Sequence, residues 1–127
     1  MIIVCVDAEP NTLMRTIKMC KKLPGKPTVF SFSRAKQALK WFDDHYADIA
    51  LLDTNMPDLD GMSLAAYIKE KSSDTSVIFV SDDARYAVDA FGVRAVGFVL
   101  KPLKIERLRA EVAYAMSNKT IMDRRKI

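Results

Sequence analysis

The segment Ile49-Ala50-Leu51-Leu52-Asp53 places four apolar residues directly before a carboxylate, and this pattern constrains the fold more than any other. A short, continuous apolar run is typical of a strand that is buried on both faces of a sheet. Pro57 and the Asp60-Gly61 pair indicate a loop before the next helix. Asp53 is therefore predicted to lie at the carboxyl end of a central strand, where open parallel sheets form their ligand crevice. A carboxylate there can serve as a metal ligand, a base or a nucleophile.

Strand-like and helix-like segments alternate five times along the chain. The pattern predicts strands over residues 2–6, 28–32, 49–53, 76–80 and 97–100, and helices over 10–23, 35–42, 61–71, 84–91 and 105–115. Ser33 is expected to cap the second helix. Buried strands that alternate with amphipathic helices imply right-handed crossovers. The sequence therefore predicts an α/β fold, a doubly wound five-stranded parallel sheet with helices on both faces.

The composition favours one globular domain without membrane segments. Of the 127 residues, 50% are hydrophobic and 28% charged, and the net charge of +4 is modest and dispersed. Cys5 and Cys20 lack metal-ligand spacing and are interpreted as buried hydrophobes in a reducing cytoplasm. Asp7 interrupts the apolar N-terminus too early for a signal peptide or a membrane span. We therefore expect a cytoplasmic protein with no membrane partner.

Polar side chains stand at the ends of four expected strands: Asp7, Asp53, Ser81 and Lys101. Because the carboxyl ends of parallel strands meet at one edge of a sheet, these four can converge on one crevice. Carboxylates bind hard divalent cations, while a lysine and a hydroxyl can hold an anion. A single acid at a strand end is as often a turn or cap residue, but four polar ends at one edge favour a functional site.

At these residues the sequence resembles the receiver domain of bacterial two-component response regulators, over nearly the whole chain. The matching motifs are Val6-Asp7, Leu52-Asp53-Thr54-Asn55-Met56-Pro57 with Asp60-Gly61, Ser81, and Lys101-Pro102. Two further segments, residues 85–91 and 95–98, are similar to the subgroup that is associated with LytTR-type DNA-binding domains. The resemblance implies the flavodoxin-like strand order 2-1-3-4-5.

The resemblance also implies a role for each site residue. Asp53 would accept a phosphoryl group from a histidine kinase, which makes the chain a signalling phosphoacceptor rather than an enzyme. Mg²⁺ would be held by Asp7, Asp53 and the backbone carbonyl of Asn55. Ser81 and Lys101 would contact the phosphoryl oxygens.

Two further residues are implied in the conformational switch. A cis peptide bond is expected before Pro102, and Phe98 corresponds to an aromatic switch residue. An acyl phosphate on Asp53 would place about two negative charges where one stood. Ser81 and Lys101 would then be drawn toward it, which would bias a two-state arrangement of the fourth helix and fifth strand. The face formed by these elements and the last helix is the expected output surface, for partner docking or a homodimer.

Two positions depart from the family pattern. The family has two adjacent acids after the first strand, but Ala8 stands in place of the second, followed by Glu9. Loss of a metal ligand predicts weak Mg²⁺ binding, unless Glu9 compensates. Asp82 stands where a small residue is usual, next to the expected phosphoryl-contacting hydroxyl. Its carboxylate either repels an incoming phosphate or restores negative charge near the metal.

Two other functions remain open from sequence. A pseudo-receiver, a protein-interaction module of the same fold that uses neither phosphate nor metal, is favoured by Ala8 and Asp82. A small phosphatase using Asp53 as a turnover nucleophile is disfavoured, because that class has its nucleophile on the first strand and a second acid where Asn55 stands.

The C-terminal segment is basic and loses the helical stripe after Met116. We predict a receiver domain over residues 1–117 and a basic tail or the start of a linker over residues 118–127. Nothing in this segment forms a recognition helix, so nucleic acid would be bound only through a domain that this chain lacks.

Overall fold

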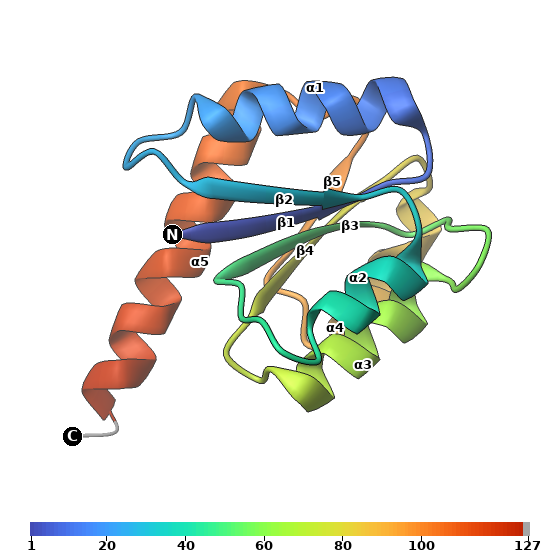
Figure 1. Ribbon diagram of the computed structural model, residues 1–127. Coiled ribbons are helices and arrows are strands. Elements are labelled where there is room, and N and C mark those ends of the chain that lie inside the picture. The colour runs from blue at the N-terminus through green and yellow to red at the C-terminus, as the bar shows by residue number, and fades with distance from the viewer. Residues whose placement is uncertain (126–127) are drawn as a thin grey trace.

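The computed structural model describes the backbone of residues 1–125 and the side chains of residues 1–119. Five parallel strands form one sheet in the order β2-β1-β3-β4-β5. Their bounds are β1 (Ile2–Val6), β2 (Thr28–Phe32), β3 (Ile49–Asp53), β4 (Ser76–Ser81) and β5 (Gly97–Leu100). The helices are α1 (Pro10–Lys21), α2 (Ala35–Trp41), α3 (Gly61–Lys71), α4 (Ala87–Gly92) and α5 (Ile105–Arg125), with a short 3-10 helix, η1 (Ala84–Tyr86), before α4. The predicted doubly wound α/β fold and its strand order are confirmed (Figure 1).

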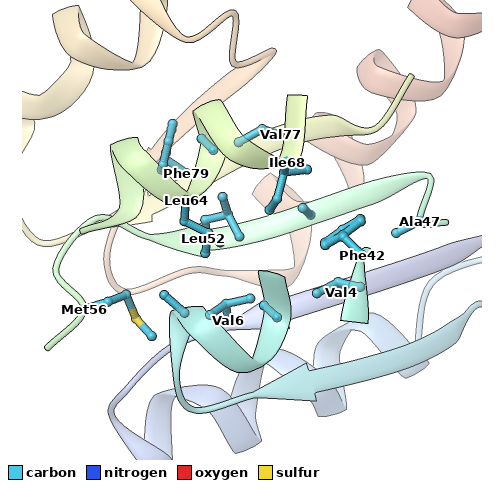
Figure 2. Packing of buried hydrophobic residues seen from close by; sticks show 14 of the residues in the cluster. Val4, Val6, Phe42, Ala47, Leu52, Met56, Leu64, Ile68, Val77 and Phe79 are labelled. Carbon is cyan, nitrogen blue, oxygen red and sulfur yellow. The ribbon is translucent and has the colours of Figure 1, made fainter. Parts of the chain in front are cut away.

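Helices cover both faces of the sheet, with α1 and α5 on one face and α2, α3 and α4 on the other (Figure 1). Every residue of β3 and β4 is buried, which explains their continuous apolar runs. Alternate residues of β3 point to opposite faces, Ala50 and Leu52 toward α2 and α3, and Ile49 and Leu51 toward α1 and α5. Figure 2 shows the hydrophobic cluster on the α2 and α3 face, which includes Val4, Val6, Phe42, Leu52, Leu64, Ile68, Val77 and Phe79.

Gly61 lets the loop after β3 fold back onto the end of that strand. Its N–H donates a hydrogen bond to the carbonyl oxygen of Thr54 at 3.1 Å. A Cβ atom on Gly61 would lie 2.2 Å from the carbonyl oxygen of Asp53 and 2.7 Å from the Thr54 Cα. No side chain fits at that distance, so glycine is required where the Asp53 loop turns into α3.

The start of α2 differs from the sequence-based expectation. Arg34, rather than Ser33, is the N-cap residue, and its side chain makes no capping hydrogen bond. Asp58, in the loop after β3, instead accepts hydrogen bonds from the backbone N–H groups of Ala35 (3.1 Å) and Lys36 (2.9 Å). The prediction that Ser33 caps this helix is wrong, because a residue distant in sequence fills the capping position.

Helix α5 continues to Arg125, so the boundary predicted at residue 117 falls inside a helix. Its last turns project beyond the sheet (Figure 1). The division into a receiver domain and a basic tail stays a prediction, and residues 126–127 of that tail lie outside the described part of the chain. None of the helices in residues 1–125 combines the length and the apolar composition that crossing a membrane requires.

Candidate functional site

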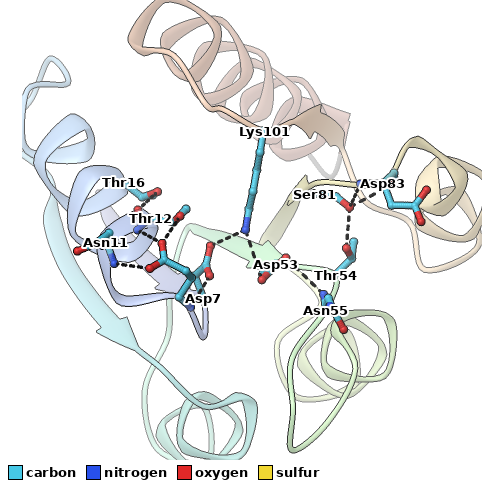
Figure 3. A network of polar contacts seen from close by, with 11 residues as sticks. Asp7, Asn11, Thr12, Thr16, Asp53, Thr54, Asn55, Ser81, Asp83 and Lys101 are labelled. Atoms are coloured by element: carbon cyan, nitrogen blue, oxygen red, sulfur yellow. Dashed lines mark hydrogen bonds and ion pairs between the residues drawn. The ribbon is translucent and has the colours of Figure 1, made fainter.

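The predicted site residues meet at the edge of the sheet that the carboxyl ends of the strands form (Figure 3). Asp7 follows β1, Asp53 ends β3, Ser81 ends β4 and Lys101 follows β5. The relative exposures of Asp7, Asp53 and Ser81 are 6%, 7% and 0%, and that of the Lys101 side chain is 13%. The structure therefore brings Asp7, Asp53 and Lys101 together in one largely buried cluster, while Ser81 lies at the same edge of the sheet with other partners.

Lys101 lies between the two carboxylates. Its Nζ atom is 3.0 Å from Asp7 Oδ2 and 3.4 Å from Asp53 Oδ2. The other oxygen of each carboxylate accepts a hydrogen bond from the backbone N–H two residues further on, Glu9 N to Asp7 Oδ1 at 2.9 Å and Asn55 N to Asp53 Oδ1 at 3.3 Å. Both carboxylates are thus held in place from the backbone and turned toward the same ammonium group.

The charges perturb one another because the cluster is largely buried. Burial and the negative charge of Asp7 raise the pKa of Asp53, although Lys101 and the N–H of Asn55 act in the opposite direction. Burial alone would lower the pKa of Lys101, but a hydrogen bond to Asp7 and the charges of Asp53, Asp7 and Asp82 raise it. Two ionised carboxylates and one ammonium leave the cluster with one net negative charge, which suits a cation.

The acid groups available to a metal are few. Among the described residues, no group of three or more His, Cys, Asp or Glu could hold a metal ion. Glu9 does not face the crevice: its carboxylate caps α1, accepting from the N–H of Asn11 (3.1 Å) and from the N–H and the hydroxyl of Thr12 (both 2.6 Å). Ala8 packs against the hydrophobic cluster on the α2 and α3 face of the sheet. The carboxylates of Asp7 and Asp53 are therefore the acidic groups available as metal ligands, and carboxylate oxygens are ligands that suit Mg²⁺.

Ser81 is tied to both neighbouring loops (Figure 3). Its Oγ atom lies 2.6 Å from Thr54 Oγ1, accepts a hydrogen bond from Asp83 N at 3.0 Å and donates to the carbonyl oxygen of Asp83 at 3.3 Å. Sequence reasoning missed Thr54. The only local signal was a hydroxyl directly after Asp53, and its partner is 27 residues away.

The remaining predicted residues surround this cluster. Exposed Asp82, with Arg15 and Lys101, lines a hollow of about 300 Å³ between α1, the end of β4 and the loop after β5. The Lys101–Pro102 peptide bond is cis, as the resemblance implied. Phe98 is half-buried on β5 and packs against the hydrophobic cluster on the α2 and α3 face.

Residues 3–113 match the family described as "Response regulator receiver domain". The chain is 37% identical over 107 residues to the positive alginate biosynthesis regulatory protein of Pseudomonas aeruginosa, covering 84% of this chain and 43% of that protein. It is also 37% identical over 115 residues to the transcriptional regulatory protein NatR of Bacillus subtilis, covering 91% of this chain and 49% of that protein. The transcriptional regulatory protein LytR of Staphylococcus aureus is 27% identical, covering 84% of this chain and 44% of that protein, in agreement with the LytTR-associated subgroup. The chain thus spans a little under half the length of these relatives.

Solved structures agree with the sequence relatives. A CheY-like receiver domain protein from Methanospirillum hungatei shares the fold with a TM-score of 0.87 and 19% identity, covering 95% of this chain and 97% of that one. The response regulator protein TrrA from Thermotoga maritima, in complex with Mg²⁺-BeF, has a TM-score of 0.81 and 25% identity, covering 90% of this chain and 97% of that one. Together with the family match over most of its length, these similarities show that the chain belongs to the response regulator receiver domain family.

Proposed function

We propose that this domain accepts a phosphoryl group on Asp53 from a histidine kinase and so acts as the switch of a two-component system. The observation that carries the proposal is the position of Lys101, whose Nζ lies 3.0 Å from Asp7 and 3.4 Å from Asp53 at the edge of the sheet. A buried carboxylate beside an ammonium group, with a hydroxyl on the next strand, offers a nucleophile and two groups that can hold phosphoryl oxygens.

The transfer forms a bond between an Asp53 carboxylate oxygen and phosphorus, and breaks the bond from phosphorus to the donor's histidine nitrogen. Such reactions depend on positioning and on charge neutralisation more than on covalent help from the protein. The hydrogen bond from Asn55 N orients the Asp53 carboxylate. Lys101 already faces Asp53, so its ammonium can hold a phosphoryl oxygen after a small shift. The Ser81 hydroxyl, now bonded to Thr54 and Asp83, has to turn toward the phosphoryl group.

Asp7, Asp53 and the backbone carbonyl of Asn55 would hold Mg²⁺, which when bound neutralises charge on the phosphoryl oxygens. The Mg²⁺-BeF complex of TrrA supports this proposal by analogy. Because Ala8 supplies no carboxylate and Glu9 caps α1, we expect the Mg²⁺ affinity to be low. Ala8→Asp should raise it by about 10–100-fold, and Ala8→Asn serves as the uncharged control in an NMR titration with Mg²⁺.

The output surface that we propose is formed by α4, β5 and α5. Val88 and Phe91 on α4 are 81% and 87% exposed, and Leu100 at the end of β5 is 50% exposed. Exposed apolar side chains of this size are typical of a surface that a partner covers. Phosphorylation would bias this surface through Ser81 and Phe98, for a homodimer or for docking. In sedimentation experiments on the phosphorylated domain, Phe91→Asp should weaken self-association, while Asp89→Asn should not.

The relatives are about twice as long as the matched region, and some are named as transcriptional regulators. We therefore propose that the receiver works with an output domain, and that any contact with nucleic acid belongs to that domain. The basic residues 118–127 would then lead toward it.

Intact mass after incubation with Mg²⁺ and a small acyl phosphate tests the proposal, beside an Asp53→Asn control. Gain of one phosphoryl group in the parent alone supports Asp53 as the acceptor. If neither the acyl phosphate nor a phosphorylated histidine kinase modifies the parent, the proposal fails.

The mass measurement and the Mg²⁺ titration together test the alternative function, a pseudo-receiver that binds partners without phosphate or metal. Ala8 and the exposed Asp82 beside Lys101 are the observations that favour it. Absence of both phosphorylation and Mg²⁺ binding in the parent would support this second function.

A further inference from the structure

Thr54, the residue directly after Asp53, makes a contact that the proposed phosphorylation chemistry does not require. Its side chain is buried, with 3% of the residue exposed, and its Oγ1 atom lies 2.6 Å from the Oγ atom of Ser81, which is fully buried. Among the side chains of residues 1–119, Ser81 is the hydrogen-bond partner of this hydroxyl. Figure 3 shows the two hydroxyls between the ends of β3 and β4.

The hydrogen bonds of the Ser81 hydroxyl can be counted. A serine hydroxyl has one proton to donate and two lone pairs to accept with. Ser81 Oγ accepts from Asp83 N at 3.0 Å and donates to the carbonyl oxygen of Asp83 at 3.3 Å. Its second lone pair can then accept the proton of Thr54. In this arrangement Ser81 uses its full hydrogen-bonding capacity, and it holds the end of β4 to the loops on either side.

The Asp83 end of this cluster continues into the output surface. The Asp83 carboxylate accepts from Arg85 N at 2.9 Å and pairs with the Arg85 guanidinium, so it caps η1 directly before α4. Backbone groups of Asp83 contact Ser81, and its side chain orders the start of η1. These contacts connect Ser81 to the segment that leads into α4.

We infer that Thr54 is a positioning residue that holds Ser81 in its resting position and opposes the switch. The inference rests on the proposed function, in which the Ser81 hydroxyl turns toward a phosphoryl group on Asp53. When Ser81 leaves, the buried hydroxyl of Thr54 loses its partner, and a buried polar group without a partner is costly. Thr54 thereby favours the unphosphorylated conformation and sets how strongly phosphorylation must act to change it.

Beryllofluoride with Mg²⁺, a phosphoryl analogue, measures this bias at equilibrium. Thr54→Val keeps the shape of the side chain but removes the hydroxyl. Movement of Ser81 then leaves no buried hydroxyl at position 54 without a hydrogen-bond partner. We expect Thr54→Val to bind beryllofluoride about tenfold more tightly than the parent in an NMR titration. The variant has a larger fraction of molecules in the conformation that binds, and the apparent affinity rises in proportion to that fraction. Thr54→Ser keeps the hydroxyl and should bind like the parent.

A double-mutant cycle tests whether Thr54 acts through Ser81. In a Ser81→Ala background, Thr54→Val should leave the beryllofluoride affinity unchanged, because the hydroxyl of Thr54 has no partner in either conformation. Equal affinities of parent and Thr54→Val, or a Thr54→Ser variant that behaves like Thr54→Val, would overturn the inference. So would a tenfold effect of Thr54→Val that persists without Ser81.

If the parent fails to bind beryllofluoride, that result counts against the proposed function and not against the role of Thr54. Hydrogen exchange of the ligand-free protein then tests the role of Thr54. The backbone N–H of Asp83 donates to Ser81 Oγ and should exchange about tenfold faster in Thr54→Val, with Thr54→Ser matching the parent. Identical exchange of this N–H in the parent and in Thr54→Val would overturn the role of Thr54 whatever the phosphorylation chemistry.

Discussion

The carboxylate of Asp58 joins the loop after β3 to the start of α2, and its removal should have a measurable effect on stability. Its two oxygens accept hydrogen bonds from Ala35 N at 3.1 Å and Lys36 N at 2.9 Å. Asp58→Ala leaves both N–H groups without a protein acceptor at the positive end of the helix dipole. Loss of an N-cap of this kind costs about 1–2 kcal/mol, and we expect the free energy of unfolding to fall by that amount.

Urea unfolding at pH 7 measures this change, with Ser33→Ala as the matched control. Ser33 occupies the position that local sequence favours for the cap, but Asp58 fills that role, so Ser33→Ala should change the free energy of unfolding by less than about 0.5 kcal/mol. Asp58→Asn keeps one acceptor oxygen and should lie between Asp58→Ala and the parent. A larger loss for Ser33→Ala than for Asp58→Ala would refute the assignment of the cap.

The contribution of Asp58 should also depend on pH. Burial acts to raise the pKa of Asp58, but the N–H groups of Lys36 and Ala35 outweigh it and hold the pKa below its ordinary value of 3.8. A carboxylate whose folded-state pKa is lowered stabilises the fold above its ordinary pKa, and this stability is lost as the pH falls through the folded-state value. The difference between parent and Asp58→Ala should therefore shrink below about pH 4.

Three further changes test other contacts. Gly61→Ala forces a Cβ to within 2.2 Å of the Asp53 carbonyl and should cost about 2–3 kcal/mol in urea unfolding, whereas Gly92→Ala, with open space around it, should cost nothing. Burial and Asp7 raise the pKa of Asp53, so its ionisation opposes folding. Asp53→Asn should therefore raise the thermal stability at pH 7 in metal-free buffer, and this gain should vanish as the pH falls through the folded-state pKa toward 3.8. Lys69→Met removes hydrogen bonds to the carbonyls of Ser73 (3.0 Å) and Thr75 (2.7 Å) and should lower the free energy of unfolding by about 1–2 kcal/mol, while Lys18→Met, an exposed control, should not.

The fold and much of the candidate site could be predicted from local patterns. Continuous apolar runs such as residues 49–52 are required wherever a strand is covered on both faces, and their alternation with helices specifies a parallel sheet. In such a sheet the last residue of each strand reaches the same edge. For this reason Asp53 and Lys101 could be expected to meet, although they lie 48 positions apart in the sequence.

The hydrogen-bond partners of several polar side chains in the loops were decided only by the tertiary structure. Glu9, a candidate metal ligand by its position after β1, is an exception, because it caps α1 through Asn11 and Thr12, which are local in the sequence. Asp58 caps a helix 23 residues before it, and Thr54 bonds to Ser81, 27 residues after it. Turn, cap and periodicity signals extend over only a few residues, because they reflect the geometry of one helix turn or one strand pair. Contacts between separate loops depend on how the crossovers pack, and that is settled only when the whole sheet and its helices are assembled.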